Sequence, residues 1–175
     1  NVFIFQNPQI MALTGNKGEW SEIYTLFKLW GDGVVYAGDQ NLNKIQDLFY
    51  PIIMILRQEK EGDINYQRKD NDVVIQTPQG EELLRVSASL FLEEAEKLLK
   101  ATHENDGAFA IPQTEAFMNR IYCHSLKAKS SDKTDIRIIL HDRRTKMNSE
   151  LGFSIKSQLG GDSTLLNASK STNFN

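Results

Sequence analysis

A chain of 175 residues with 40% hydrophobic and 25% charged residues has the size and composition of one globular domain. No apolar run reaches the roughly 18 residues of a membrane helix, and the single cysteine, Cys123, excludes an internal disulfide and a thiolate metal cage. The net charge is −3, but residues 120–175 hold ten Lys and Arg against five Asp and Glu, a local +5. Such a basic segment is typical either of a phosphate-facing surface or of ordinary solvated loops.

The start of the chain lacks the pattern of a signal peptide, so we expect a cytoplasmic protein without a membrane partner. Residues 1–14 are expected to form a short strand or an arm. Over 15–31 the aromatic and apolar residues recur every three or four positions, which predicts an amphipathic helix that ends at Gly31-Asp32-Gly33. On that helix Gly18 and Glu22 are one turn apart on the same face. We therefore expect a close neighbour at Gly18 and a carboxylate beside it.

Residues 34–126 are expected to supply strands, a hairpin and two helices. Strands are predicted at 34–37, 50–56 and 85–88, the hairpin at 64–76, and the helices at 90–100 and 113–123. Residues 39–48 are expected to form a loop with a helical turn, and the charged segment 57–63 is expected to be solvated. The three histidines, His103, His124 and His141, lack a metal-ligand spacing and are interpreted as structural or surface residues.

Two runs of β type in the last third of the chain carry polar residues. In 134–140, alternation places Ile136, Ile138 and Leu140 on one face and Asp135, Arg137 and Ile139 on the other. In 152–158, Ser154, Lys156 and Gln158 share a face. With 141–150 as a turn-rich connection, a hairpin would bring Asp135 near Ser154 and Lys156. A polar row on apolar strands is costly unless it has partners or a function.

Phosphodiester hydrolysis with Mg²⁺ would give this row a function. Mg²⁺ takes hard oxygen ligands and keeps several waters, so Asp135 would supply one ligand and the backbone carbonyl of Ile155 another. Lys156 would orient or deprotonate the attacking water and offset the charge of the transition state. The spacing alone leaves open that an acid and a lysine meet on adjacent strands by chance, with Lys156 an ordinary surface residue.

A second carboxylate is wanted two positions before the lysine, where the chain has Ser154. A hydroxyl is a weak, uncharged ligand, so we expect Glu22 to supply the missing acid. Gln158 would line the same pocket as a hydrogen-bonding group. Glu19 competes for the metal role but lies nearly a full turn from Glu22.

Three segments resemble the HpaII family of type II restriction endonucleases: GNKGEWSEIY at 15–24, YPIIMILR at 50–57 and GFSIKSQLGGDSTLLNAS at 152–169. The resemblance covers nearly the whole chain from about Ala12. It implies a PD-(D/E)XK nuclease of α/β (α+β) class, with a mixed central sheet flanked by helices. It also implies Mg²⁺ (or Mn²⁺ as a substitute), a double-stranded DNA substrate, and cleavage at a short palindrome, CCGG by expectation, in a restriction-modification system.

By that resemblance Asp135 matches the first acid of the nuclease motif, Lys156 its lysine and Glu22 the helix acid. Ser154 departs from the acidic pattern. The segment after the second run is interpreted either as a DNA contact or as a capped helix start. The candidate DNA-binding residues are Arg137, Arg143, Arg144, Ser163, Thr164, Asn167, Ser169 and Lys170.

We expect a single nuclease domain over 1–175, in which 134–170 form the catalytic hairpin and a DNA-facing segment, and a homodimer is one option for its assembly. Since the family sequences continue beyond Asn175, the chain is expected to be an N-terminal portion of a longer enzyme. Two alternatives remain open. One is a DNA-binding module with a degenerate nuclease centre, motivated by Ser154, and the other is a related nuclease of repair or junction resolution.

Overall fold

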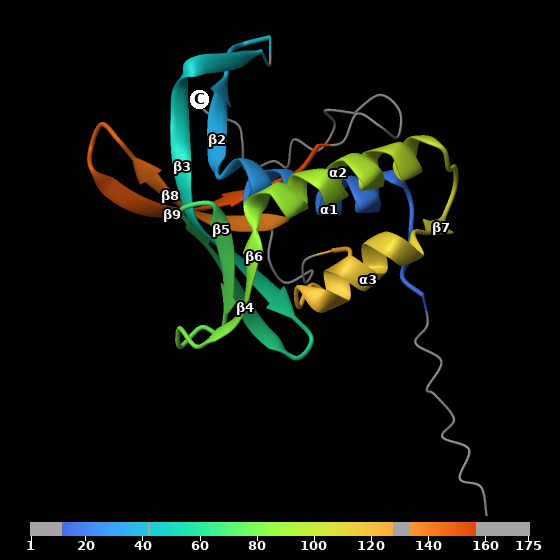
Figure 1. Cartoon of the computed structure of the whole chain (residues 1–175). Helices are drawn as coiled ribbons and strands as arrows, with labels where there is room; N and C mark the ends of the chain where they lie inside the picture. Colours follow the sequence, from blue (N-terminus) through green and yellow to red (C-terminus); the bar gives the residue numbers. More distant parts are fainter. Residues whose placement is uncertain (1–11, 42, 128–133, 157–175) are drawn as a thin grey trace, which may run out of the picture.

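The computed structural model describes residues 12–41, 43–127 and 134–156 (Figure 1). Three helices and nine strands are assigned in these ranges. In chain order they are β1 (Thr14–Gly15), α1 (Lys17–Asp32), β2 (Val34–Gly38), β3 (Lys44–Glu59), β4 (Gly62–Lys69), β5 (Asp72–Gln76), β6 (Glu82–Ser87), α2 (Ala88–His103), β7 (Phe109–Ala110), α3 (Pro112–Arg120), β8 (Ile136–Asp142) and β9 (Met147–Phe153).

The long strand β3 organises the main sheet of seven strands, because β2, β4 and β8 all pair with it. Residues 44–51 of β3 pair with β2. Residues 54–56 lie between β4 and β8, where Ile55 is opposite both Tyr66 and Ile138, and residues 57–59 continue the pairing with β4. β5 and β6 extend the sheet beyond β4, and β9 extends it beyond β8. All of these pairs are antiparallel.

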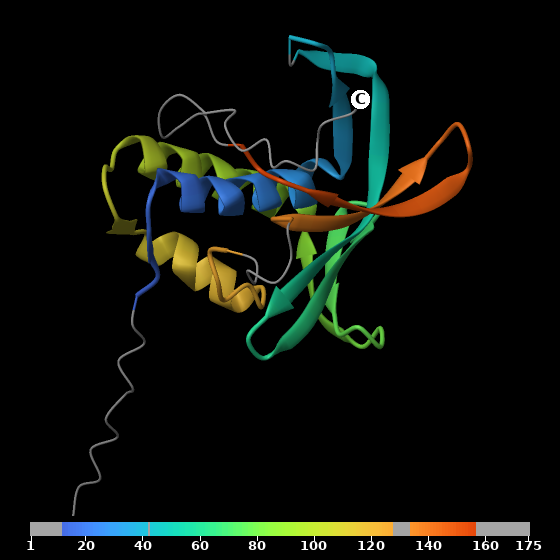
Figure 2. The same ribbon diagram turned by 180° about the vertical axis from the view of Figure 1, so that it is seen from behind.

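The three helices lie together on one side of the sheet (Figures 1 and 2). Between α1 and the sheet, the rings of Trp30 and Tyr66 stack with centroids 4.2 Å apart. The fully buried Phe27 and Phe91 meet edge to face at 6.2 Å and join α1 to α2. Burial of such large aromatic side chains contributes much of the folding free energy, about 25 cal/mol for each Å² of apolar surface removed from water. This aromatic layer fixes α1 against β3 and β4.

Several sequence predictions are confirmed. The 15–31 periodicity corresponds to α1, which Gly33 ends in the left-handed conformation (φ 69°). The hairpin predicted at 64–76 is β4–β5, and the two later helices are α2 and α3. The predicted class, a sheet flanked by helices, is also confirmed, although the sheet was expected to be mixed and each pair described is antiparallel. Across the described ranges, none of the helices combines the length and hydrophobicity that a membrane span requires.

Three local predictions are wrong. Residues 39–48 were expected to contain a helical turn, whereas β3 begins at Lys44 and continues without interruption to Glu59. The segment 57–63 was expected to be solvated, whereas Arg57 and Glu59 are 6% and 3% exposed because they face the helices from β3. The close approach expected at Gly18 lies instead at Gly31, where a Cβ would be 2.4 Å from Leu92 of α2.

Candidate active site

Glu22 is positioned by a strongly capped helix. Asn16 caps α1 by accepting from the Glu19 backbone NH at 3.0 Å, while the Glu19 carboxylate accepts from the Asn16 NH at 2.8 Å. Glu19 also pairs with Lys127 at 2.8 Å, and these contacts lower its pKa. A capping box satisfies two backbone donors at the start of a helix and so fixes the first turn. The Glu19 carboxylate is therefore already bound at the helix cap. Glu22, one turn later and partly buried, has the carboxylate that remains available as a metal ligand.

Asp135 immediately precedes β8 and is tied to the end of β9. Its backbone NH donates to the Phe153 carbonyl at 2.9 Å, and its carboxylate accepts from the Ile155 NH at 2.6 Å. Both contacts join residues about twenty positions apart. A carboxylate held by a backbone donor keeps one orientation. Asp135 is therefore held in place by hydrogen bonds to the backbone at the end of β9.

The environment of Glu22 makes its carboxyl group harder to ionise. Burial, and then the charge of Asp135, raise the pKa of Glu22 to about 7, against the opposing positive charges of Lys127 and Arg57. A cavity of about 20 Å³ adjoins Asp135 and is also lined by Leu26 of α1 and by Arg57. That volume is enough for about one water molecule. Helix α1, strand β3 and the β8–β9 hairpin thus converge at two neighbouring carboxyl groups.

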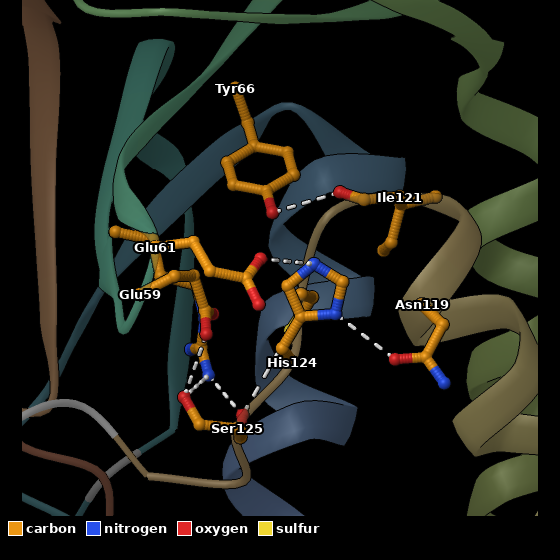
Figure 3. Close-up of polar contacts among 9 residues, drawn as sticks. Glu59, Glu61, Tyr66, Asn119, Ile121, His124 and Ser125 are labelled. Carbon is orange, nitrogen blue, oxygen red and sulfur yellow. Dashed lines mark hydrogen bonds and ion pairs between the residues drawn. The ribbon is translucent and has the colours of Figure 1, made fainter. Parts of the chain in front are cut away.

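A strap formed by residues 121–127 fastens α1 to β3 beside this site. Arg57 donates to Glu59 and to the Ser125 carbonyl, and the Ser125 hydroxyl donates to Glu59 at 3.0 Å. Figure 3 shows Ser125 next to Glu59, and the Tyr66 hydroxyl directed at the carbonyl of Ile121, with an O···O distance of 3.0 Å. A buried guanidinium is tolerated only when it is paired and hydrogen-bonded in this way. The strap therefore holds Arg57 close to the carboxyl groups of Glu22 and Asp135.

The β8–β9 hairpin differs from the prediction in where it turns. The turn comprises 143–146 rather than 141–150, because the Asp142 side chain accepts from the Arg144 NH at 2.8 Å and Lys146 adopts a left-handed conformation (φ 61°). Strand β9 therefore ends at Phe153. The expectation that Ser154 and Lys156 lie on a strand is wrong, since both follow β9. The expected alternation is found, because both are exposed while Phe153 and Ile155 pack against the core.

Lys156 comes directly after Ile155, the residue that binds the Asp135 carboxylate through its NH. No hydrogen bond or ion pair joins Lys156 to Asp135 or Glu22 in the portion of the chain that the structure describes. Gln158 lies outside the described residues, as do Ser163, Thr164, Asn167, Ser169 and Lys170.

The candidate DNA-binding arginines occupy two environments. Arg137 bonds to Glu150 across the hairpin, with an Nε–Oε1 distance of 2.9 Å, so its charge is shared with a carboxylate. Arg143 and Arg144 are exposed in the β8–β9 turn. Unlike Arg137, neither of these two turn residues is ion-paired with an acid among the described residues.

The carboxylate pair fits a magnesium ion in its donor chemistry. Over 12–41, 43–127 and 134–156, no three His, Cys, Asp or Glu side chains gather closely enough to hold a metal. Mg²⁺ does not need three, because it is commonly bound by one or two carboxylates and keeps several waters. The raised pKa of Glu22 supports the fit, since a divalent cation would offset the repulsion that Asp135 exerts on it.

Comparison with known proteins shows which family the chain belongs to. The family model described as HpaII restriction endonuclease matches residues 16–175. The chain belongs to the HpaII restriction endonuclease family. A curated relative, the type II restriction enzyme HpaII of Haemophilus parainfluenzae, is 47% identical over 163 residues, 92% of this chain and 45% of the relative. The chain thus spans about half the length of that relative. No solved structure matches it.

Within this member of the HpaII family, sequence reasoning missed Arg57, Glu59 and Lys127. The segment 57–63 was interpreted as solvated because it is rich in charge. The available signal was alternation: Ile55, Arg57 and Glu59 are spaced by two, and continuing the buried face of the strand through them predicts a buried ion pair. The role of Lys127 depends on the path of the strap, which no local pattern predicts.

Proposed function

We propose that the protein is a Mg²⁺-dependent type II restriction endonuclease that hydrolyses double-stranded DNA at a short palindrome, CCGG by family resemblance. Two observations carry this proposal: Asp135 lies near enough to Glu22, more than a hundred residues away in the chain, to raise its pKa, and Asp135 lines a cavity together with Leu26 of the same helix. Membership of the HpaII family supports it. The activity belongs to the full-length protein, in which a homodimer would match the two-fold symmetry of a palindrome.

In this proposal the two carboxylates would hold the metal ion, together with the backbone carbonyl of Ile155. The ion would supply Lewis acidity and stabilise negative charge on the phosphate. The hydrogen bond from the Ile155 NH keeps Asp135 oriented, and Arg57 tempers the repulsion between the two acids. Lys156, next in the chain, would orient or deprotonate the attacking water, and Ser154 and Gln158 would hydrogen-bond around it.

The direct test is digestion of a defined plasmid by the full-length protein, followed by sequencing of the ends. With Mg²⁺ we expect discrete fragments whose ends share one palindrome, and no cutting in EDTA. The Lys156→Ala variant should lose cutting but keep its DNA affinity, with Lys60→Ala, an exposed lysine of the β3–β4 turn, as the control. Ends without a common sequence would favour a repair or junction nuclease instead.

A DNA-binding module with a degenerate centre is the second candidate. Ser154 in place of an acid and the lack of a direct Lys156–Asp135 contact favour it. Calorimetric titration with Mn²⁺ distinguishes the two functions. A heat of metal binding in the wild type that is absent from the Asp135→Asn variant supports the nuclease. A protein that binds DNA but gives no heat of metal binding supports the module.

A further inference from the structure

Two hairpins that lie beyond the active site are connected by a row of four side chains, in which two neighbouring aromatic rings have a cation at each end. The Lys44 ammonium lies 3.5 Å from the centre of the Tyr36 ring, and the Arg143 guanidinium lies 5.0 Å from that of Phe49. The Tyr36 and Phe49 rings are themselves 5.9 Å apart. We call these four residues the arm row. It begins on the β2–β3 arm and ends on the turn of the β8–β9 hairpin.

The cations of the arm row are not neutralised by carboxylates. Among the described residues, no ion pair within 4.0 Å includes Lys44 or Arg143, whereas Lys17, Lys28 and Lys97 on the helices are each paired with an acid. The nearest acid of the turn, Asp142, accepts hydrogen bonds from the backbone of its own turn. The aromatic rings hold the two cations in place without cancelling their charge.

The arm row is displaced from the carboxylate pair along the hairpin. From Asp135 to Asp142 the chain advances seven residues, about 23 Å at roughly 3.3 Å per residue in a strand. In Figures 1 and 2 the β2–β3 arm and the β8–β9 turn project from the side of the sheet away from α3. Since successive phosphates of one DNA strand are about 3.4 Å apart along the axis, this distance corresponds to roughly seven base pairs.

We propose that the arm row is a second contact surface for the backbone of double-stranded DNA, with Lys44 and Arg143 each binding a phosphate outside the cleavage site. This inference rests on the proposed function. Two fixed cations without acidic partners, on separate elements, best fit a partner with regularly spaced negative charges, and the phosphates of a DNA backbone have such a spacing. The rings of Tyr36 and Phe49 fix the spacing between the two cations, so both would engage one duplex together.

The test is the salt dependence of duplex binding by the full-length protein, without a divalent metal so that no strand is cut. Each phosphate contact contributes about 0.9 to the slope of log K against log salt concentration. Lys44→Ala and Arg143→Ala should each reduce the slope by about 0.9 for every protomer bound to the duplex, and Arg143→Lys should restore most of it. Lys100→Ala, an exposed lysine at the far end of α2, is the matched control and should leave the slope unchanged.

Duplex length gives a second readout. Lengthening a duplex from roughly four to ten base pairs on each side of the site should strengthen binding by the wild type and not by the Lys44→Ala/Arg143→Ala double variant. Equal slopes in the arm-row variants and the control would overturn the inference, as would a changed association state with unchanged DNA binding, which would indicate a contact between copies of the chain. If the wild type itself binds no duplex, the proposed function fails instead.

Discussion

The Glu22 carboxyl group lies where two effects oppose its ionisation. Partial burial on α1 removes hydration from the charged form, and the neighbouring Asp135 adds like charge, so the pKa rises to about 7. Lys127 and Arg57 moderate the rise without cancelling it. A carboxyl group that is half protonated near neutral pH is poised to exchange its proton for a metal ion. The same environment that suits the group to bind metal makes it a source of instability in the metal-free protein.

This instability predicts a specific pH dependence. With an ordinary pKa of 4.5 in the unfolded chain and about 7 when folded, Glu22 favours the folded state most below pH 4.5, and this advantage is lost as pH rises to 7. Glu22→Gln lacks the effect, so in EDTA the variant should melt above the wild type at pH 8, with the gap closing toward pH 5. Glu96→Gln, on the exposed face of α2, should show no such change. A gap independent of pH would contradict the assigned pKa.

At the scale of elements, the 121–127 strap, strand β3 and helix α1 form one unit. Arg57 and Glu59 are buried on β3 and are fully engaged only because the strap brings Ser125 to them. The strap continues to Lys127, which pairs with Glu19 at the cap of α1. Disturbing the buried pair would therefore loosen the support of the helix that carries Glu22.

Arg57→Met should be strongly destabilising, because it leaves the Glu59 carboxylate, 3% exposed, without its cation. Removing one member of a buried pair typically costs about 3–5 kcal/mol. The double variant Arg57→Met/Glu59→Leu should recover a large part of this loss, since replacing both members by apolar groups is often nearly neutral. Urea unfolding measures both. A single variant as stable as the double one would show that the pair is not coupled as described.

At the scale of the whole molecule, the site is an assembly rather than a local motif. Periodicity was enough to predict α1, and alternation was enough to place Ile136, Ile138 and Leu140 on the buried face of β8, because both patterns follow directly from backbone geometry. Nothing local indicated that β3 would continue through Arg57 to Glu59. Strand pairing extended it, since β4 supplies partners for Arg57, Gln58 and Glu59.

The placement of Lys156 could not be predicted for a related reason. The end of β9 depends on the length of the preceding turn, and the Asp142 cap shortened that turn to four residues. The pairing shifted accordingly, and the residues after Phe153 left the strand. The sequence did indicate an acid at the start of β8, Asp135, and a helix acid near it, Glu22. Those predictions depended on residue type and family resemblance, and not on where the strands end.

The central claim is that Glu22 supplies the carboxylate that the Ser154 position lacks. Its most direct test is the single-turnover cleavage rate of the full-length protein with Mg²⁺, compared among the wild type, Glu22→Gln and Asp135→Asn. Loss of a group that stabilises the transition state typically lowers the rate by about 10²–10³. Both variants should fall by about that factor while keeping their affinity for duplex DNA. A Glu22→Gln variant that cuts at nearly the wild-type rate while Asp135→Asn does not would contradict the claim.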